Sequence, residues 1–316
     1  MGLRWTAAVA IAGTALIFAA SEAGLRLEGA GAYPVCDVGG EIKYIPSANQ
    51  HGIGRNRNEW HFNDRHMASR SNWSAEAHPN IVITGNSIVV GSLESNFDGL
   101  LGAQLAKQLK DHYAVWPVAA PGWSNVNEMA YFDRNGDVLR NADVVVIEFM
   151  EGGMSGPDPW PGYNFCPSWR PWSRIAHTLL RAWYSGAAFF APRNNPSSPP
   201  AMGMPDENQL ERFKEFVNGI PKASKLIMFF YPTIANLRDR AAWRRTIAPV
   251  MEICRGAGAK CIDFAEVPDW NEEAYLADGV HQTARGTKTL ASVLANAINE
   301  YSEPKISRPG EPSAQP

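Results

Sequence analysis

Apolar and polar positions form alternating blocks between residues 80 and 301. Short apolar runs bounded by turn-forming residues predict strands, and the amphipathic segments between them predict helices. The expected strands span residues 80–84, 114–119, 143–149, 225–231 and 260–264. The expected helices span residues 97–109, 125–132, 208–217, 241–255 and 283–301. This alternation predicts one parallel sheet with helices on both faces.

The start of the chain has a different pattern. Residues 6–20 are an uncharged apolar run, which is short for crossing ~30 Å of hydrocarbon but suits the apolar part of an export signal. The pattern continues to residue 27, and Arg4 and Arg26 at its edges also suit an uncleaved anchor. We therefore expect residues 1–27 to be a signal peptide or a membrane anchor.

Three further segments depart from the strand–helix pattern. Residues 28–79 are polar and irregular, which predicts loops with short edge strands. Residues 152–205 are rich in proline and tryptophan and predict an insertion beside the sheet, with a helical piece at 174–184. Its tryptophans either pack the insertion onto the sheet or stack on sugar rings. Residues 302–316 are polar with several prolines and predict a disordered tail.

Composition narrows the class of protein. The 316 residues are 45% hydrophobic and 19% charged, as in a globular chain, and the net charge is -3. Without a long basic block, binding to nucleic acid is not expected. The cysteines Cys36, Cys166, Cys254 and Cys261 lack paired metal-ligand spacing. In an oxidising compartment they suit two disulfides, Cys254 with its near neighbour Cys261 and Cys36 with Cys166; four free buried thiols are the alternative.

Two separated motifs carry candidate chemistry. Asp278 and His281 are three residues apart in LADGVHQTARGTKTLA, so the carboxylate can bond one ring nitrogen and leave the other as a base. Ser87 directly follows the first predicted strand in NIVITGNSIVVGS. Because parallel strands end at one edge of a sheet, we expect Ser87, Asp278 and His281 to converge there.

Three blocks resemble the SGNH, or GDSL-type, serine esterases: ITGNSIVVGS, VAAPGWS and DGVHQTARGTKTLA. The resemblance implies a flavodoxin-like three-layer α/β/α sandwich with a hydrolase domain over residues 80–301. It also implies a catalytic triad of Ser87, His281 and Asp278, with an oxyanion hole formed by the N–H groups of Ser87 and Gly122. No metal or organic cofactor is implied.

The chain also departs from the family pattern. Asn86 stands where the family usually has Asp, and the position of the third oxyanion donor, usually Asn, falls on Gly152. Loss of one such donor typically costs ~10²–10³ in rate. Asn125, Asn127 or a backbone N–H near Gly152 are candidates to replace it.

The expected function is that of a serine esterase acting on an O-acyl or O-acetyl ester. The resemblance and the N-terminal segment favour an envelope glycan ester as substrate and a periplasmic location, with the chain tethered to the inner membrane. Two alternatives remain open: an O-acyltransferase that passes the acyl group to a polysaccharide, and a non-catalytic binding protein on the same fold.

Overall fold

The computed structural model describes residues 2–29, 31–54, 57–77, 79–91, 96–110, 112–163, 165–184 and 206–302. The second half of the predicted insertion, residues 185–205, lies outside this part of the chain. So does the predicted tail, except that Ser302 ends the last helix.

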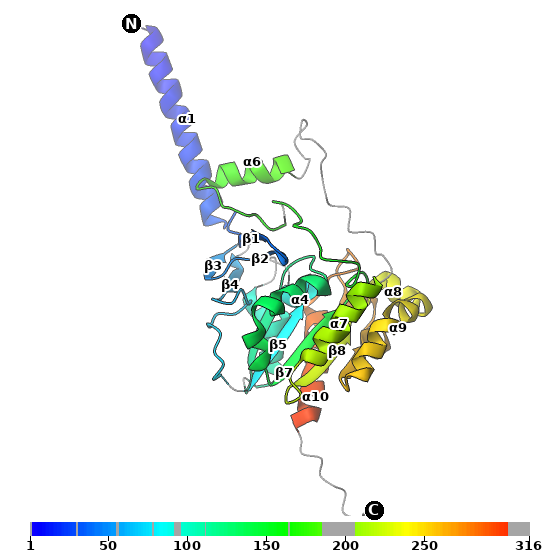
Figure 1. The fold of residues 1–316 in the computed structure, drawn as a ribbon. Coiled ribbons are helices and arrows are strands. Elements are labelled where there is room, and N and C mark those ends of the chain that lie inside the picture. Colours follow the sequence, from blue (N-terminus) through cyan, green and yellow to red (C-terminus); the bar gives the residue numbers. More distant parts are fainter. Residues whose placement is uncertain are drawn as a thin grey trace, which may run out of the picture.

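A five-stranded parallel sheet forms the centre of the molecule (Figure 1). Its strands are β5 (Asn80–Gly85), β6 (Ala114–Ala119), β7 (Val144–Phe149), β8 (Lys225–Phe230) and β9 (Lys260–Asp263). The spatial order β6-β5-β7-β8-β9 is 2-1-3-4-5 in chain order, which is the flavodoxin-like arrangement. The predicted fold class is confirmed, and each predicted strand end lies within one residue of the observed one.

Helices cover both faces of this sheet. One hydrophobic cluster packs Val145 and Ile147 against α4 (Asn125–Arg134), α7 (Glu207–Gly219) and α9 (Arg240–Gly256). The other packs Val144 and Val146 against α2 (Ser87–Val90), α3 (Leu101–Gln108) and α10 (Ala284–Ser302). Successive residues of β7 thus face opposite layers, as the period of two in a strand requires.

The predicted single helix at residues 97–109 is wrong. The chain instead forms the short turn η2 (Phe97–Gly99) and then α3, because Leu100 between them has an extended backbone (φ -71°, ψ 154°). The short helix α2 (Ser87–Val90) and four other short elements also escaped prediction. The other four are α5 (Gly136–Arg140), α8 (Ile234–Arg238), η3 (Phe264–Glu266) and η4 (Glu272–Ala274).

The segment before the sheet holds two small antiparallel pairs. β1 (Cys36–Gly39) pairs with β2 (Lys43–Pro46), and β3 (Gln50–Ile53) pairs with β4 (Glu59–Phe62). The expected short strands are present, but none of them joins the central sheet.

Both expected disulfides are present. Cys36–Cys166 links β1 to the segment that precedes α6 (Arg174–Tyr184), and Cys254–Cys261 links α9 to β9. Two disulfides indicate an oxidising location outside the cytoplasm.

The first helix projects away from the α/β body (Figure 1). It is α1 (Gly2–Leu27), and its segment Trp5–Leu27 is long and apolar enough to cross a membrane and is not buried in the protein. The helix therefore continues through the residues that the sequence left ambiguous, and it suits either a signal or an anchor. The helical piece predicted inside the insertion is α6, which lies beside the C-terminal end of α1.

Candidate active site

A sharp turn after β5 presents the hydroxyl of Ser87. The strand ends at Gly85, and Ser87 is the first residue of α2. Asn86 caps this helix, since its Oδ1 accepts the N–H of Ile88 at 2.8 Å. Gly85 is needed because a Cβ there would lie 2.2 Å from Oε2 of Glu148.

A second turn, which follows η4, holds His281. The turn closes where the N–H of Leu276 donates to the carbonyl of His281 at 2.7 Å, and Gly279 has φ of +71°. Tyr231, just beyond β8, donates its hydroxyl to the carbonyl of Val280 at 2.7 Å. The position of the imidazole is therefore set by the sheet as well as by its own turn.

The two turns bring the three predicted side chains into one relay. Nε2 of His281 lies 2.9 Å from Oγ of Ser87, and Nδ1 lies 2.7 Å from Oδ2 of Asp278. A carboxylate accepts the Nδ1 hydrogen, which leaves Nε2 free to accept a proton from the hydroxyl. Gln282 adds a brace, because its Nε2 donates to the carbonyl of Ile88 in α2 at 2.8 Å.

Asp278 is held in its ionised form. Partial burial acts to raise its pKa, but the N–H groups of Val280 and His281 and the ring of His281 outweigh this, so the pKa of Asp278 is lowered. The carboxylate is therefore charged throughout the neutral range, as an orienting and charge-stabilising partner requires.

Gly122 lies at the predicted position of an oxyanion donor. Its φ is +79°, and a Cβ there would come 3.2 Å from the hydroxyl of Tyr44, which donates to the carbonyl of Pro121 at 2.6 Å. Within the described parts of the chain, the N–H groups of Ser87 and Gly122 have no hydrogen-bond acceptor. Both donors are thus available to a ligand.

The usual third donor is missing, and two of its candidate replacements are occupied. The side-chain amide of Asn125 donates to Glu128 and to the carbonyl of Glu148, at 3.1 and 2.6 Å. That of Asn127 donates to the carbonyls of Ile42 and Asp158 at 3.0 and 3.1 Å. Both amides therefore hold the fold together.

A different amide faces the same region. Nδ2 of Asn86 lies 3.7 Å from Sδ of Met150, and the Asn86 side chain also interacts with the carboxyl of Glu148. Asn86, Gly122 and Gly152 line a common hollow of about 160 Å³. This amide is a further candidate donor, which the sequence did not suggest because the resemblance places a carboxylate at this position.

Comparison with known proteins gives similarity only at the level of structure. No family model matches the chain, and no curated protein matches it. The esterase EstA from Pseudoalteromonas sp. is 11% identical with a TM-score of 0.43, over 71% of this chain and 98% of that one. A carbohydrate acetylesterase family member from Sinorhizobium meliloti is 12% identical with a TM-score of 0.41, over 70% and 97%. A GDSL-like lipase from Bacteroides thetaiotaomicron is 13% identical with a TM-score of 0.37, over 71% and 89%.

These structural neighbours are esterases and lipases by description. At such identities and TM-scores, the similarity carries no argument about chemistry. The function must therefore be argued from the side chains of the site.

Two buried acids lie beneath the serine turn. Oε2 of Glu148, on β7, accepts the N–H of Asn86 at 2.9 Å, and Glu128 of α4 is buried beside it. Burial raises the pKa of Glu148 to about 8, and burial together with the neighbouring Glu148 raises that of Glu128. Both shifts favour the protonated form of the carboxyl. In the sequence, the sign of this buried pair is Glu148, a glutamate inside the otherwise apolar run VVVIEF.

Glu148→Gln is expected to flatten the pH dependence of stability. Glutamate in the unfolded chain titrates near 4.5, so between that pH and about 8 the unfolded state loses a proton that the folded state keeps. Stability therefore falls as pH rises through this window, at most by ~1.4 kcal/mol per unit of pKa difference. Glutamine keeps an acceptor for Asn86 but does not titrate.

Urea unfolding in detergent at pH 5 and pH 8 measures this change. The exposed Glu215→Gln substitution is the matched control and should leave the wild-type difference intact. An equal fall in wild type and Glu148→Gln would contradict the assignment.

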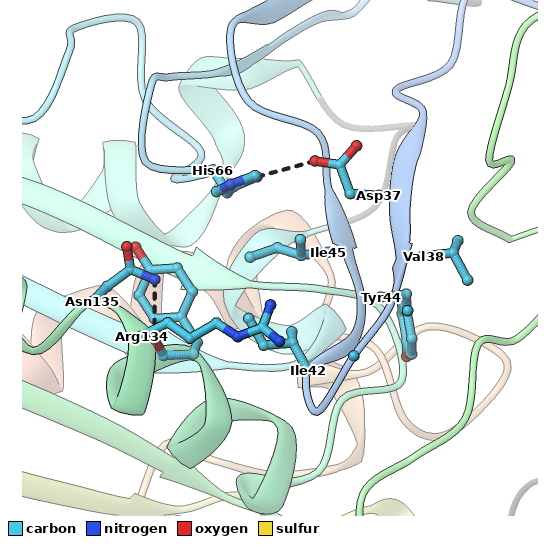
Figure 2. A pocket seen from close by; sticks show the side chains of 11 residues that line it. Asp37, Val38, Ile42, Tyr44, Ile45, His66, Arg134 and Asn135 are labelled. Atoms are coloured by element: carbon cyan, nitrogen blue, oxygen red, sulfur yellow. Dashed lines mark hydrogen bonds and ion pairs between the residues drawn. The ribbon is translucent and has the colours of Figure 1, made fainter.

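Two connected pockets lie at or beside Ser87 and His281, and a larger hollow lies apart from them. Ser87 and His281 line a hollow of about 170 Å³, and an apolar pocket walled by Trp60 and Phe165 adjoins it through Gly91 and Leu100. A separate hollow of about 510 Å³ lies between the β1–β2 pair and the end of α4 (Figure 2). It contains none of the relay residues.

Proposed function

We propose that this protein is a serine esterase in which Ser87 is the nucleophile. The supporting observation is the unbroken relay from Asp278 through His281 to Ser87, with both links within hydrogen-bond distance. These residue types in this order of contact suit the removal of a proton from a hydroxyl that attacks a carbonyl.

The reaction proceeds through an acyl-enzyme. Oγ of Ser87 bonds to the ester carbonyl carbon while Nε2 of His281 takes its proton. The N–H groups of Ser87 and Gly122 and the amide of Asn86 stabilise the oxyanion. The imidazolium then protonates the leaving alcohol. Water, activated by the same ring, releases the acid and restores the serine.

The exposure of the site favours hydrolysis over transfer to a sugar. The side chains of His281 and Asp278 are 36% and 48% exposed, so water reaches the relay. An acyltransferase must keep water from the acyl-enzyme. We therefore take hydrolysis as the primary reaction. A purely binding role would not require the hydrogen-bonded alignment of Asp278, His281 and Ser87.

The proposed substrate class rests on the expected location and on the resemblance to serine esterases. An N-terminal helix that suits a signal or an anchor, together with two disulfides, supports a substrate outside the cytoplasm. We propose that residues 80–301 form the hydrolase domain, that it acts at the outer face of the inner membrane, in the periplasm, and that it removes O-acyl or O-acetyl groups from an envelope glycan.

Labelling with a fluorophosphonate tests the proposal. The reagent is expected to form an adduct on Ser87, found by mass spectrometry of the digested protein, because only an activated serine attacks phosphorus readily. Labelling of other residues alone, or no labelling of a folded sample, would reject the esterase assignment.

Asn86→Asp is expected to lower kcat by about 10²-fold, the typical cost of one oxyanion donor. The carboxylate still caps Ile88, so the helix start is kept. It places a negative oxygen where the amide donor was. Hydrolysis of an activated aryl ester measures the effect, with an unchanged melting temperature as the control for folding. Activity at or above the wild-type level would show that Asn86 is only a cap.

A further inference from the structure

Helix α6 is packed through its polar side. His177 is buried, with Nδ1 2.9 Å from the hydroxyl of Tyr163. The guanidinium of Arg181 lies over the ring of Tyr33, with Cζ 4.4 Å from the ring centre. Arg174 bonds the carbonyl of Gly31. Positions 174, 177 and 181 share one side of a helix, so this side is the one that contacts the protein.

The apolar side of α6 is exposed. Leu179 and Trp183 are 64% and 46% exposed, and Trp172, just before the helix, is 79% exposed. The spacing of four residues places Leu179 and Trp183 on one face of the helix. Phe165 and Trp169 in the preceding segment are exposed as well. A surface helix in water has the opposite arrangement, so this apolar surface requires something to cover it.

The beginning of α6 is fixed to the end of α1. The carboxylate of Glu22 accepts the N–H groups of Arg174 and Ile175, at 2.8 and 3.1 Å, and the hydroxyl of Ser173 at 2.9 Å. Arg26 donates to the carbonyl of Trp172. Glu22 thereby caps α6 from another helix, and Figure 1 shows α6 running crosswise from this end of α1.

The depth of this junction is set by helix length. About 20 residues are needed to cross ~30 Å of hydrocarbon as a helix. The uncharged residues 5–21 of α1 precede Glu22 and are just long enough to span the hydrocarbon, so a membrane-spanning α1 brings Glu22 and Arg26 close to the boundary between lipid tails and head groups. The helix that they hold then lies at the same boundary.

We propose that α6 is an interfacial helix, and that the surface formed by Trp172, Leu179 and Trp183 is covered by the lipid bilayer into which α1 inserts. Tryptophan is favoured at the head-group level, and an amphipathic helix lies in the plane of the interface with its apolar side inward. The inference is independent of the esterase proposal, because no residue of the relay enters it.

Site-specific fluorescence in vesicles tests this placement. All four native cysteines are in disulfides, so one introduced cysteine is the sole free thiol. The full chain carrying Leu179→Cys or Trp183→Cys is labelled with a nitrobenzoxadiazole probe. It is then reconstituted into phosphatidylcholine–phosphatidylglycerol vesicles, with or without lipid bearing a shallow nitroxide. Glu215→Cys on α7 is the remote control, and Thr178→Cys on the flank of α6 is the control on the same helix.

Probes at 179 and 183 are expected to shift to the blue and to lose emission in nitroxide vesicles. The probe at 215 should do neither, and the probe at 178 should lose less than the probe at 179. Unchanged circular dichroism shows that the variants fold. Emission unaffected by nitroxide at both 179 and 183 would overturn the proposal. A blue shift without quenching would also overturn it, because it would indicate cover by a second copy or by another protein.

Discussion

Ser87→Ala is expected to lower kcat for an activated aryl ester by about 10⁴-fold or more, the loss typical of removing the nucleophile from such a relay. The substitution deletes one oxygen that bonds only the ring of His281. The backbone of α2 and the cap by Asn86 are untouched, so the binding of substrate should change little. The residual rate would come from the oxyanion donors and from binding alone.

The control for this variant is a serine at the other end of the sheet. Ser224 precedes β8 and donates to the carbonyl of Ala142 at 2.7 Å, so Ser224→Ala perturbs the fold without touching the relay. It should retain wild-type activity, and Ser87→Ala should lose both turnover and the fluorophosphonate adduct. Retained turnover in Ser87→Ala, with a normal melting temperature, would remove the basis of the esterase proposal.

The sheet was predictable because its signal is local. Each strand is a short apolar run that is buried on both faces and is bounded by turn residues at both ends. β7 and β8 can therefore be recognised without knowledge of their neighbours. The approach of Asp278 to His281 is also local, since the two residues are three positions apart in one turn. The meeting of His281 with Ser87, 194 residues apart, was expected only because parallel strands end at one edge.

What the sequence did not reveal depends on contacts between distant segments. The hydroxyl of Tyr44 lies against Gly122, and no local pattern couples these positions. Leu100 takes an extended backbone that splits one predicted helix, although its neighbours favour a helix. In α6 the periodicity correctly predicted a helix but not its orientation, because the amphipathic pattern is the same whether protein or lipid covers the apolar side.

Asp278→Asn is expected to lower kcat by about 10²–10⁴-fold, with little change in KM. In the wild type, the carboxylate accepts the Nδ1 hydrogen of His281 at 2.7 Å. An amide that turns its NH₂ toward the ring favours the tautomer with the hydrogen on Nε2. That nitrogen would then donate to Ser87 and could no longer take its proton. The stabilising charge beside the imidazolium would be lost as well.

The size of the fall in kcat of Asp278→Asn distinguishes an orienting role of the carboxylate from a purely structural one. Oδ1 of Asp278 also accepts the N–H groups of Val280 and His281, and asparagine retains this acceptor, so the turn should keep its shape and the melting temperature should hold. Asp206→Asn, which keeps the cap of α7 far from the relay, is the matched control and should have wild-type activity. If Asp278→Asn also stayed within about tenfold of wild type, the imidazole would be held by its turn and by Ser87 alone. The charge on Asp278 would then have no part in the reaction, since within the described part of the chain the ring nitrogens of His281 contact only Asp278 and the serine hydroxyl.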